Sequence, residues 1–333
     1  MNARIAALWS LALIITGMLA PCRPATAQPA AHPLITQAEY DRWLVELSNW
    51  GRWGANDEMG TLNLITPSKR AQAAALVKEG LTVSLASNAV KEKQVDVPCP
   101  VEWAMVTASD AGATDRIGYP CIHGAGTTHL DSFAHRFFNG KMWNGYVVKE
   151  TISKEGGATR NSILTMKGGI LTRAVLYDIP RLKGVPYLEP GMRIYPEDLE
   201  AWEKKTGVKA GPGDALLVRW GRWARRDKVG PYSTDDQSAG LDNSVIPWLK
   251  KRDIALLAWE TPGYAPQPPG DLPRLALHDF VLAMLGVHLI DRADLEAVSA
   301  AAAARNRWQF MLMVAPLPIP NGTGSPVNPI AVF

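Results

Sequence analysis

The sequence has few cysteines, little net charge and no long apolar run beyond its first residues. Only three of its 333 residues are cysteine, and none forms a C-x-x-C pair, so cysteines are not the obvious metal ligands. The formal net charge of +3 does not suggest a nucleic acid or an anionic membrane surface as a partner. No later stretch reaches the roughly 18 uninterrupted apolar residues of a membrane-spanning helix. These features favour a protein that acts on a small molecule.

Three common catalytic motifs are also missing. The chain has no G-x-S-x-G nucleophile elbow, no G-x-x-x-x-G-K-[ST] phosphate loop and no G-x-G-x-x-G dinucleotide turn. The sequence therefore gives no support for a serine hydrolase of that type, for a P-loop enzyme or for a nicotinamide-dependent enzyme.

The first 27 residues have the pattern of a secretory signal peptide. Arg4 supplies a positive charge, residues 5–19 are mostly apolar, and Ala25-Thr26-Ala27 is typical of a cleavage site. We therefore expect an exported protein, periplasmic in a Gram-negative host and without a membrane anchor after cleavage. The mature chain, residues 28–333, is expected to form a single domain.

Three of the six histidines lie within thirteen residues and share their neighbourhood with one aspartate. If residues 128–131 form a strand, its two-residue period places His129 and Asp131 on the same face. His135 follows a short stretch of small residues and could return to the same place, either as a metal ligand or as a base. Imidazole and carboxylate groups both bind divalent metals and both transfer protons near neutral pH. The alternative is that these histidines only satisfy hydrogen bonds in a polar core.

The rest of the chain alternates between strand and helix patterns, which argues for an α/β domain. Proline and glycine concentrate in residues 262–273 and 316–329, which we interpret as ordered loops; the first runs toward His278 and is a candidate rim or lid. The basic run 222–228 is predicted to be a solvated face. Expected strands cover residues 174–177 and 215–218, and expected helices cover residues 72–78, 196–205 and 295–305.

Two features flank the histidine cluster in the sequence. Cys99 and Cys121 could pair in an oxidising compartment and would then anchor the segment leading into the cluster. Of the twelve tryptophans, Trp103 and Trp143 are the best candidates for lining an apolar or aromatic substrate pocket.

The cluster resembles the signature of the cyclase family, which includes bacterial kynurenine formamidase and isatin hydrolase. The usual pattern is His-x-Gly-Thr-His-x-Asp-x-Pro-x-His, and Thr128-His129-Leu130-Asp131 with His135 fits its second half. In the first half, the ligand histidine is replaced by Ala125, with His123 two places earlier, and the proline is replaced by Phe133. The sequence motif HG-x3-THLD-x3-H, followed by GKMWNG, resembles a longer-chain branch of the family. Further segments match that branch in order, among them NWGRWGANDEMGTLNLIT, GPGDALLVRWGRW and LHDFVLAMLGVHLIDRADLEAV.

The resemblance implies a fold and a set of roles. The fold is a swivelling β/β/α arrangement, with a mixed barrel-like sheet flanked by helices, and relatives tend to form dimers or tetramers. His129 and Asp131 would be metal ligands, His278 the later histidine ligand and His135 the catalytic histidine. Asp291 lies near the place of a ligand glutamate, with Asp294 or Glu296 as alternatives, and His123 either binds the metal or borders the site. His288 is expected to be structural.

These residues predict a metal-dependent hydrolase. One zinc or manganese ion, with a second ion as an alternative, would activate water and polarise a carbonyl, and His135 would move the proton. The expected substrate is a cyclic amide or an N-formyl aryl amide, with a lactone or other ester as an alternative. Two other readings stay open: an exported protein that captures a metal or small molecule without turnover, and a metal that only stabilises the fold.

Overall fold

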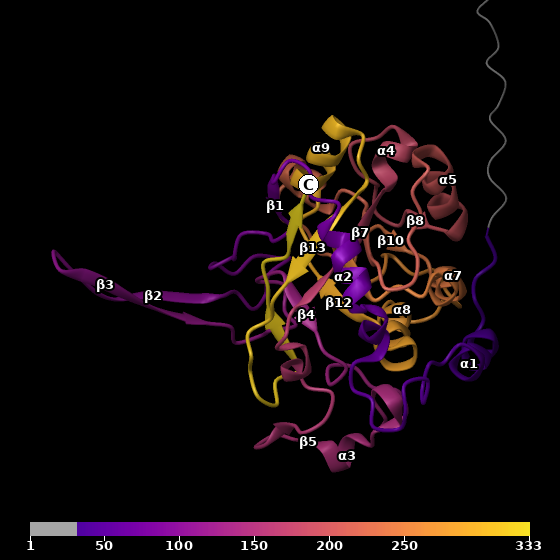
Figure 1. Ribbon diagram of the computed structural model, residues 1–333, viewed down its shortest axis with the longest axis horizontal. Coiled ribbons are helices and arrows are strands. Elements are labelled where there is room, and N and C mark those ends of the chain that lie inside the picture. The colour runs from indigo at the N-terminus through magenta and orange to yellow at the C-terminus, as the bar shows by residue number, and fades with distance from the viewer. Residues whose placement is uncertain (1–31) are drawn as a thin grey trace, which may run out of the picture. The chain divides into compact units, whose positions relative to one another are not determined.

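A mixed sheet of nine strands runs through the computed structural model, which describes residues 32–333 (Figure 1). The signal peptide predicted for residues 1–27 lies outside the described residues. Residues 34–333 form one compact unit. Within the described part of the chain, no helix has both the length and the apolar character needed to cross a membrane.

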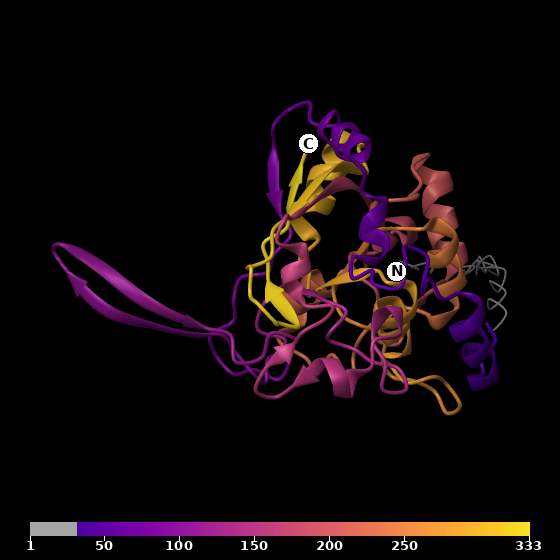
Figure 2. The ribbon, with the colours of Figure 1, turned by 60° about the horizontal axis from the view of Figure 1, so that its bottom comes forward.

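The strands of the main sheet are β1 (Thr82–Ser84), β4 (His129–Asp131), β7 (Ile170–Asp178), β9 (Ala215–Arg219), β11 (Leu256–Trp259), β12 (His288–Asp291), β13 (Gln309–Val314), β14 (Gly324–Pro326) and β15 (Ile330–Val332). Their order is β1-β15-β13-β7-β9-β11-β12-β4-β14. The four strands β7, β9, β11 and β12 are parallel, and the pairs on either side of them are antiparallel. This mixed, curled sheet with flanking helices confirms the predicted fold class (Figures 1 and 2).

The parallel centre of the sheet is almost wholly apolar. Every residue of β9 and β11 is buried, as expected for parallel strands that are covered on both faces. The predicted strands 174–177 and 215–218 lie within β7 and β9 and are confirmed. Strands β12 and β4 carry the buried residues His129, Asp131 and Asp291 of the predicted site, together with the buried His288.

The helices are α1 (Gln37–Glu46), α2 (Pro67–Ala74), α3 (Val148–Thr151), α4 (Ile179–Lys183), α5 (Pro196–Thr206), α6 (Arg222–Val229), α7 (Ile246–Arg252), α8 (Ala276–Phe280) and α9 (Glu296–Arg305). Short 3₁₀ turns are η1 (Gly60–Leu64), η2 (Trp143–Gly145), η3 (Ile163–Met166) and η4 (Asn243–Val245), and η5 (Val281–Leu285) is a π-helical turn. The helices predicted over 196–205 and 295–305 are confirmed as α5 and α9.

The helix predicted over 72–78 is displaced toward the N-terminus. Thr66 caps the start of α2 by accepting a hydrogen bond from the Lys69 amide, and Pro67 occupies the first turn, where its missing N–H costs nothing. The helix ends at Ala74, and the amides of Glu79 and Gly80 donate instead to the carbonyl of Phe333. The chain thus leaves the helix early to join the C-terminal edge of the sheet.

Three smaller sheets have two strands each: β2 (Glu102–Ser109) with β3 (Gly112–Gly118), β5 (Ile152–Ser153) with β6 (Gly157–Ala158), and β8 (Arg193–Ile194) with β10 (Gly240–Leu241). Residues 262–273 contain neither helix nor strand, as predicted, whereas the expected loop 316–329 includes β14.

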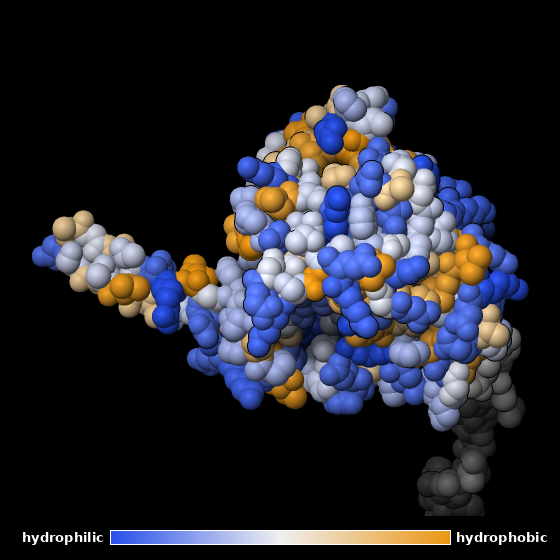
Figure 3. All heavy atoms as spheres, turned by 90° about the horizontal axis from the view of Figure 1, so that it is seen from below, coloured by the Kyte–Doolittle hydropathy of each residue, from blue (hydrophilic) through white to orange (hydrophobic). Residues whose placement is uncertain are grey.

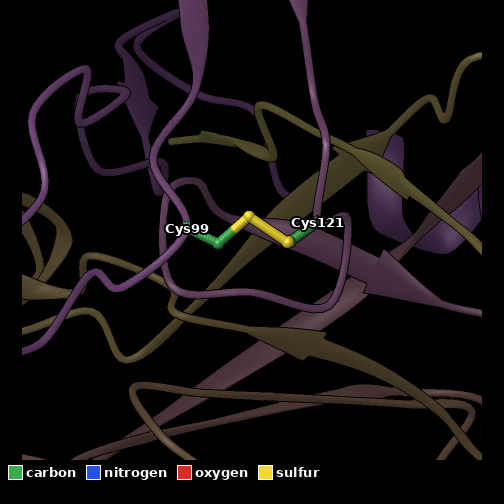
Figure 4. The surroundings of a disulfide bond; sticks show 2 residues. All are labelled: Cys99 and Cys121. Atoms are coloured by element: carbon green, nitrogen blue, oxygen red, sulfur yellow. A yellow bond between two sulfur atoms is a disulfide. The ribbon is translucent and has the colours of Figure 1, made fainter.

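The hairpin of β2 and β3 projects away from the rest of the molecule (Figures 1 and 2). A disulfide between Cys99 and Cys121 joins the two segments from which it rises (Figure 4). Apolar and polar side chains lie side by side on this arm (Figure 3). The bridge therefore closes the base of the projecting hairpin immediately before His123.

Candidate metal centre and its cavity

Strand β4 carries two of the predicted site residues, His129 and Asp131, on the same face. His129 and Asp131 are buried and lie two residues apart on a strand, so their side chains share a face. The neighbouring strand β12 pairs antiparallel with β4 and places Asp291 opposite His129. Three chemically active side chains therefore meet across two adjacent strands.

Asp131 is the centre of the arrangement. It is fully buried, and imidazole nitrogens of four histidines surround its carboxylate. The distances to this carboxylate are 2.6 Å from His123 Nδ1, 3.2 Å from His278 Nε2, 3.5 Å from His129 Nε2 and 3.9 Å from His135 Nε2. The structure thus brings together residues 123–135 of the cluster and a histidine almost 150 residues later in the chain.

His278 and Asp291 are held by a shared tryptophan. His278 lies on α8, which continues directly into the π-helical turn η5, and its Nε2 is 3.5 Å from Asp291 Oδ2. Trp259, at the end of β11, donates its indole N–H to Asp291 Oδ1 and stacks on the His278 ring at 6.0 Å. Trp259 therefore fixes one carboxylate oxygen of Asp291 and leaves the other facing His278.

His123 approaches the same carboxylate from the disulfide-anchored segment. Its Nδ1 hydrogen-bonds to Asp131, and its Nε2 lies 2.9 Å from the Thr323 hydroxyl. Gly324 makes this approach possible, because a Cβ added there would lie 2.7 Å from His123 Cε1. His135 stacks flat on His123 at 3.4 Å between ring centroids. His123 thus has both nitrogens occupied in the structure.

The donor set fits a divalent metal ion. Ligand atoms of His129, Asp131 and Asp291 all lie within 4.8 Å of one another, and so do those of His123, Asp131 and His135. His129 donates from Nδ1 to the Thr127 carbonyl, which leaves its buried Nε2 without a hydrogen-bond partner and oriented as a ligand nitrogen usually is. Imidazole and carboxylate together suit a borderline ion such as zinc or manganese.

Protonation states in the cluster follow from burial and from the two carboxylates. Burial opposes ionisation of Asp131, but the surrounding histidines hold its pKa well below the usual range. Burial also opposes a charge on His278, yet hydrogen bonds to Asp131, Asp279 and Asp291 raise its pKa well above the ordinary value. A proton on His278 therefore balances the carboxylates in the way that a bound cation would.

His135 is held differently. Burial is the largest influence on its imidazole and lowers its pKa to about 3. Its nearest carboxylate oxygen is 3.9 Å away, beyond hydrogen-bonding distance. His135 therefore differs from His123 and His278, which are hydrogen-bonded to the Asp131 carboxylate.

A cavity of about 260 Å³ opens beside the cluster. One part of its lining, which we call the metal wall, contains His123, His129 and Asp291, and another part, which we call the arginine wall, contains Asp96 and Arg292. Pro262, Thr261 and Arg274 also line it, so the loop predicted as a rim does border the cavity. The metal cluster, by which we mean His123, His129, Asp131, His135, His278 and Asp291, therefore faces a space suited to a small molecule.

The two tryptophans predicted for the substrate pocket lie elsewhere. Trp103 is on the projecting hairpin, 44% exposed, and donates its indole N–H to Asp115. Trp143 is fully buried, where it packs on Phe133 and donates to Asp57. Trp259, which contacts His278 and Asp291 of the metal cluster, ends the buried strand β11, and its sequence position alone gives no sign of that role.

The remaining expectations concern His288 and the basic run. His288 is buried on β12, stacks on Phe133 and donates from Nδ1 to the Asp131 carbonyl, which agrees with a structural part. The run 222–228 forms most of α6, and its predicted solvated face is wrong for Arg222. That side chain is buried against Asp96, because the loop before the projecting hairpin covers the helix.

Comparison with known proteins identifies the family of the chain. The family model "Cyclase" matches residues 73–266, more than half of the sequence. A crystal structure described as a novel cyclase is 31% identical, with a TM-score of 0.76 over 86% of this chain and 100% of that one. Isatin hydrolase A from Labrenzia aggregata, bound to benzyl benzoate, has the same fold at 20% identity, with a TM-score of 0.55 over 78% of this chain and 94% of that one. An isatin hydrolase bound to the product analogue thioisatinate is similar at 18% identity and a TM-score of 0.53, over 78% and 94% of the two chains. No curated protein matches the sequence. The chain belongs to the cyclase family.

Proposed function

We propose that the protein is a metal-dependent hydrolase that cleaves the carbon–nitrogen bond of a cyclic amide or an N-formyl aryl amide. The observation that carries this proposal is the buried Asp131 carboxylate, surrounded by imidazoles, one of which presents an unpartnered Nε2. A buried polar atom without a partner is costly, and a bound cation would satisfy it.

His129, Asp131, His278 and Asp291 are the proposed ligands. When bound, a zinc or manganese ion acts as a Lewis acid toward a carbonyl and lowers the pKa of water. Trp259 holds Asp291, and His123 holds Asp131 through Nδ1, so both carboxylates are oriented by groups outside the ligand set. Such support is expected to tune metal affinity.

His135 is the proposed general base. Its neutral imidazole accepts a proton from the attacking water and returns it to the leaving nitrogen when the carbon–nitrogen bond breaks. A lactone or aryl ester requires the same transfer, to oxygen instead of nitrogen. The choice of amides rests on the family and on the isatin hydrolases that share the fold.

The proposal is tested by hydrolysis before and after chelation. Purified mature protein is assayed with N-formylkynurenine, isatin, a γ-lactam and an aryl ester, then stripped with a chelator and reloaded with zinc or manganese. We expect turnover of an amide that is lost on chelation and restored by metal. Bound metal with no turnover of any substrate would favour the alternative, an exported protein that only captures a ligand, and unfolding on chelation would favour a purely structural metal.

We also propose that the mature protein is exported. The support is the leader pattern of residues 1–27 together with the Cys99–Cys121 bridge, since disulfides persist in oxidising compartments. Detection of a mature N-terminus at Gln28 in the periplasmic fraction would test this.

A homo-oligomer is the last part of the proposal. Trp103, Val106 and Ile117 are 44–60% exposed on a hairpin that pairs only with itself. Isolated two-stranded hairpins are marginally stable in water, and packing against a second copy would cover these side chains. Light scattering should give a mass of two or four chains.

A further inference from the structure

Arg292 is a buried arginine whose guanidinium is not hydrogen-bonded to any carboxylate of the described residues. It follows Asp291 directly, lines the cavity and is only 4% exposed. Its guanidinium lies 5.5 Å from the centre of the Trp223 ring and donates from Nη1 to the main-chain carbonyl of Asp96 at 3.4 Å, while Nε and Nη2 have no hydrogen-bond partner. A buried guanidinium in this condition is costly unless an anion joins it.

The Asp96 carboxylate, whose residue also lines the cavity, is already hydrogen-bonded to two other arginines. Asp96 accepts from Arg222 Nη2 at 2.9 Å and from Arg226 Nε at 2.7 Å. Arg222 itself keeps Nε and Nη1 unpartnered. We call Arg222, Arg226 and Arg292, gathered around Asp96, the arginine cluster; two of its three guanidinium groups are hydrogen-bonded to that one carboxylate, and Glu260 and Asp291 act on the cluster through their charge alone.

This shortage of hydrogen-bonded carboxylates is not a general feature of buried arginines in the molecule. Arg219 is also buried, but it donates to Asp178 at 2.9 Å, to Glu296 at 2.6 Å and to the Pro186 carbonyl. Burial acts to lower its pKa, yet these partners raise the pKa overall. For Arg292, burial and the charge of Arg222 lower the pKa well below the usual value. Arginine nevertheless keeps its proton in proteins, so Arg292 remains a cation.

The other charged groups of the cavity are occupied as well. Asp235 pairs with Arg274, which also donates to the Pro262 carbonyl. Asp291 faces His278 and Trp259. Among the described residues that line the cavity, none therefore has a carboxylate hydrogen-bonded to the Arg292 guanidinium.

We propose that Arg292 binds a carboxylate of the substrate, so that the substrate class is an aryl or cyclic amide bearing an anionic group. This deepens the proposed function and rests on it. The planar guanidinium has two buried, unpartnered donor atoms and matches a carboxylate, and the residues of the metal cluster that line the same cavity would receive the amide carbonyl. The ligand would be oriented at both ends, by the metal ion and by Arg292.

The kinetic test compares substrates that differ only in charge. Formanilide is assayed beside its ortho-, meta- and para-carboxyl derivatives and the matching methyl esters, with wild type, Arg292→Gln and Arg292→Lys. We expect wild type to prefer one carboxylate isomer over its methyl ester, and Arg292→Gln to lower kcat/KM for that isomer about ten- to hundredfold, as for a lost hydrogen bond to a charged group. Formanilide hydrolysis should fall much less than hydrolysis of the carboxylate isomer, and Arg292→Lys should restore part of the preference. An equal loss on charged and neutral substrates would overturn the proposal.

A binding test separates this inference from the hydrolase itself. Benzoate is titrated by calorimetry into chelated, metal-free protein, where the metal cannot hold the carboxylate. We expect saturable binding that Arg292→Gln weakens about tenfold or more and that Arg305→Gln, far from the cavity, leaves unchanged. Binding that depends on Arg292 in a protein with no turnover would support the anion site and reject the hydrolase. Binding that requires metal, or that Arg292→Gln does not alter, would reject the anion site.

A second variant protects against a folding artefact. Arg292 has a left-handed backbone, with φ of 57°, and asparagine tolerates that conformation better than most residues. Arg292→Asn should therefore melt near the wild-type temperature and show the same loss of benzoate binding and of charge preference. A well-folded Arg292→Asn variant with wild-type preference would contradict the proposal.

Discussion

The metal wall and the arginine wall of the cavity differ in the charge of the group that each would bind. On one wall, the carboxylates of Asp131 and Asp291 lie among imidazoles, and the unpartnered buried atom is a ligand nitrogen of His129. On the other, Arg292 lies beside two further arginines, and the unpartnered atoms are N–H donors. Although Asp291 and Arg292 are adjacent in the chain, one belongs to a site for a cation and the other to a site for an anion.

The difference also concerns how each wall responds to pH. Hydrogen bonds to carboxylates raise the pKa of His278 well above its ordinary value, so protons and metal ions compete for the metal cluster. Guanidinium groups do not titrate in this range, so the arginine cluster keeps its charge. The predictions below separate the two walls.

The largest effect is expected from Asp131→Asn, because Asp131 is shared by both candidate ligand sets. Metal content should fall from about one ion per chain to less than about a tenth, and kcat/KM by on the order of a thousandfold or more, since metal binding requires the deprotonated carboxylate. Elemental analysis and kinetics measure both, with the exposed Glu189→Gln as control. Retention of a full equivalent of metal by Asp131→Asn would contradict the assignment.

His135→Ala should lower turnover by about a hundred- to ten-thousandfold, because it removes the proposed base and leaves the other ligands in place. Metal content should stay nearly unchanged. The same two assays apply, and a large loss of metal would show instead that His135 is a ligand, as in the set with His123 and Asp131.

Metal affinity should depend on pH through His278. Its pKa is raised because it hydrogen-bonds to carboxylates, so below that pKa a proton must leave before a metal ion can bind. Affinity should therefore fall up to about tenfold for each unit of decreasing pH and level off above the raised pKa. A competition titration with a chelating dye from pH 5.5 to 8 measures this. Benzoate binding to the metal-free protein provides the comparison, since Arg292 does not titrate; an affinity for metal that is independent of pH would speak against His278 as a ligand.

The smallest effect on the site is expected from removing the disulfide. Cys99 and Cys121 are 22 residues apart, so replacing both with serine should destabilise the fold by about 3 kcal/mol through loop-closure entropy. Because Cys121 precedes His123 by two residues, metal affinity should fall as well, by less than about tenfold. Chemical denaturation and metal titration check the two expectations. Unchanged stability would indicate that the hairpin base is fixed by other contacts.

Much of the metal wall could be predicted from the sequence, because its pattern is local. A two-residue period is enough to place His129 and Asp131 on one face of a strand. His278 and Asp291 are distant in sequence, and only the resemblance to a family suggested that they join the cluster. The sequence suggested only that Cys99 and Cys121 could pair if the chain is exported, and the position of their bridge at the base of the hairpin required the fold.

The arginine cluster could not be predicted from the sequence, because its residues come together only in the folded chain. Arg222 and Arg226 are spaced as on one helix face and look like solvated residues, until the segment of Asp96 covers them. Arg292 is 70 residues from Arg222, and no local pattern marks it. Trp103 and Trp143 were expected in the substrate pocket because they lie close to the histidine cluster in the sequence. In the folded chain, Trp103 lies on the projecting hairpin and Trp143 in the core.

The most direct test of the account is anomalous X-ray scattering from crystals of metal-loaded protein, recorded at the zinc and manganese absorption edges. The account predicts an ion at about 2.0–2.2 Å from His129 Nε2 and from carboxylate oxygens of Asp131 and Asp291, with His278 as a further ligand and His135 outside bonding distance. An ion held by His123 and His135, or no ion in the cluster after loading, would contradict it.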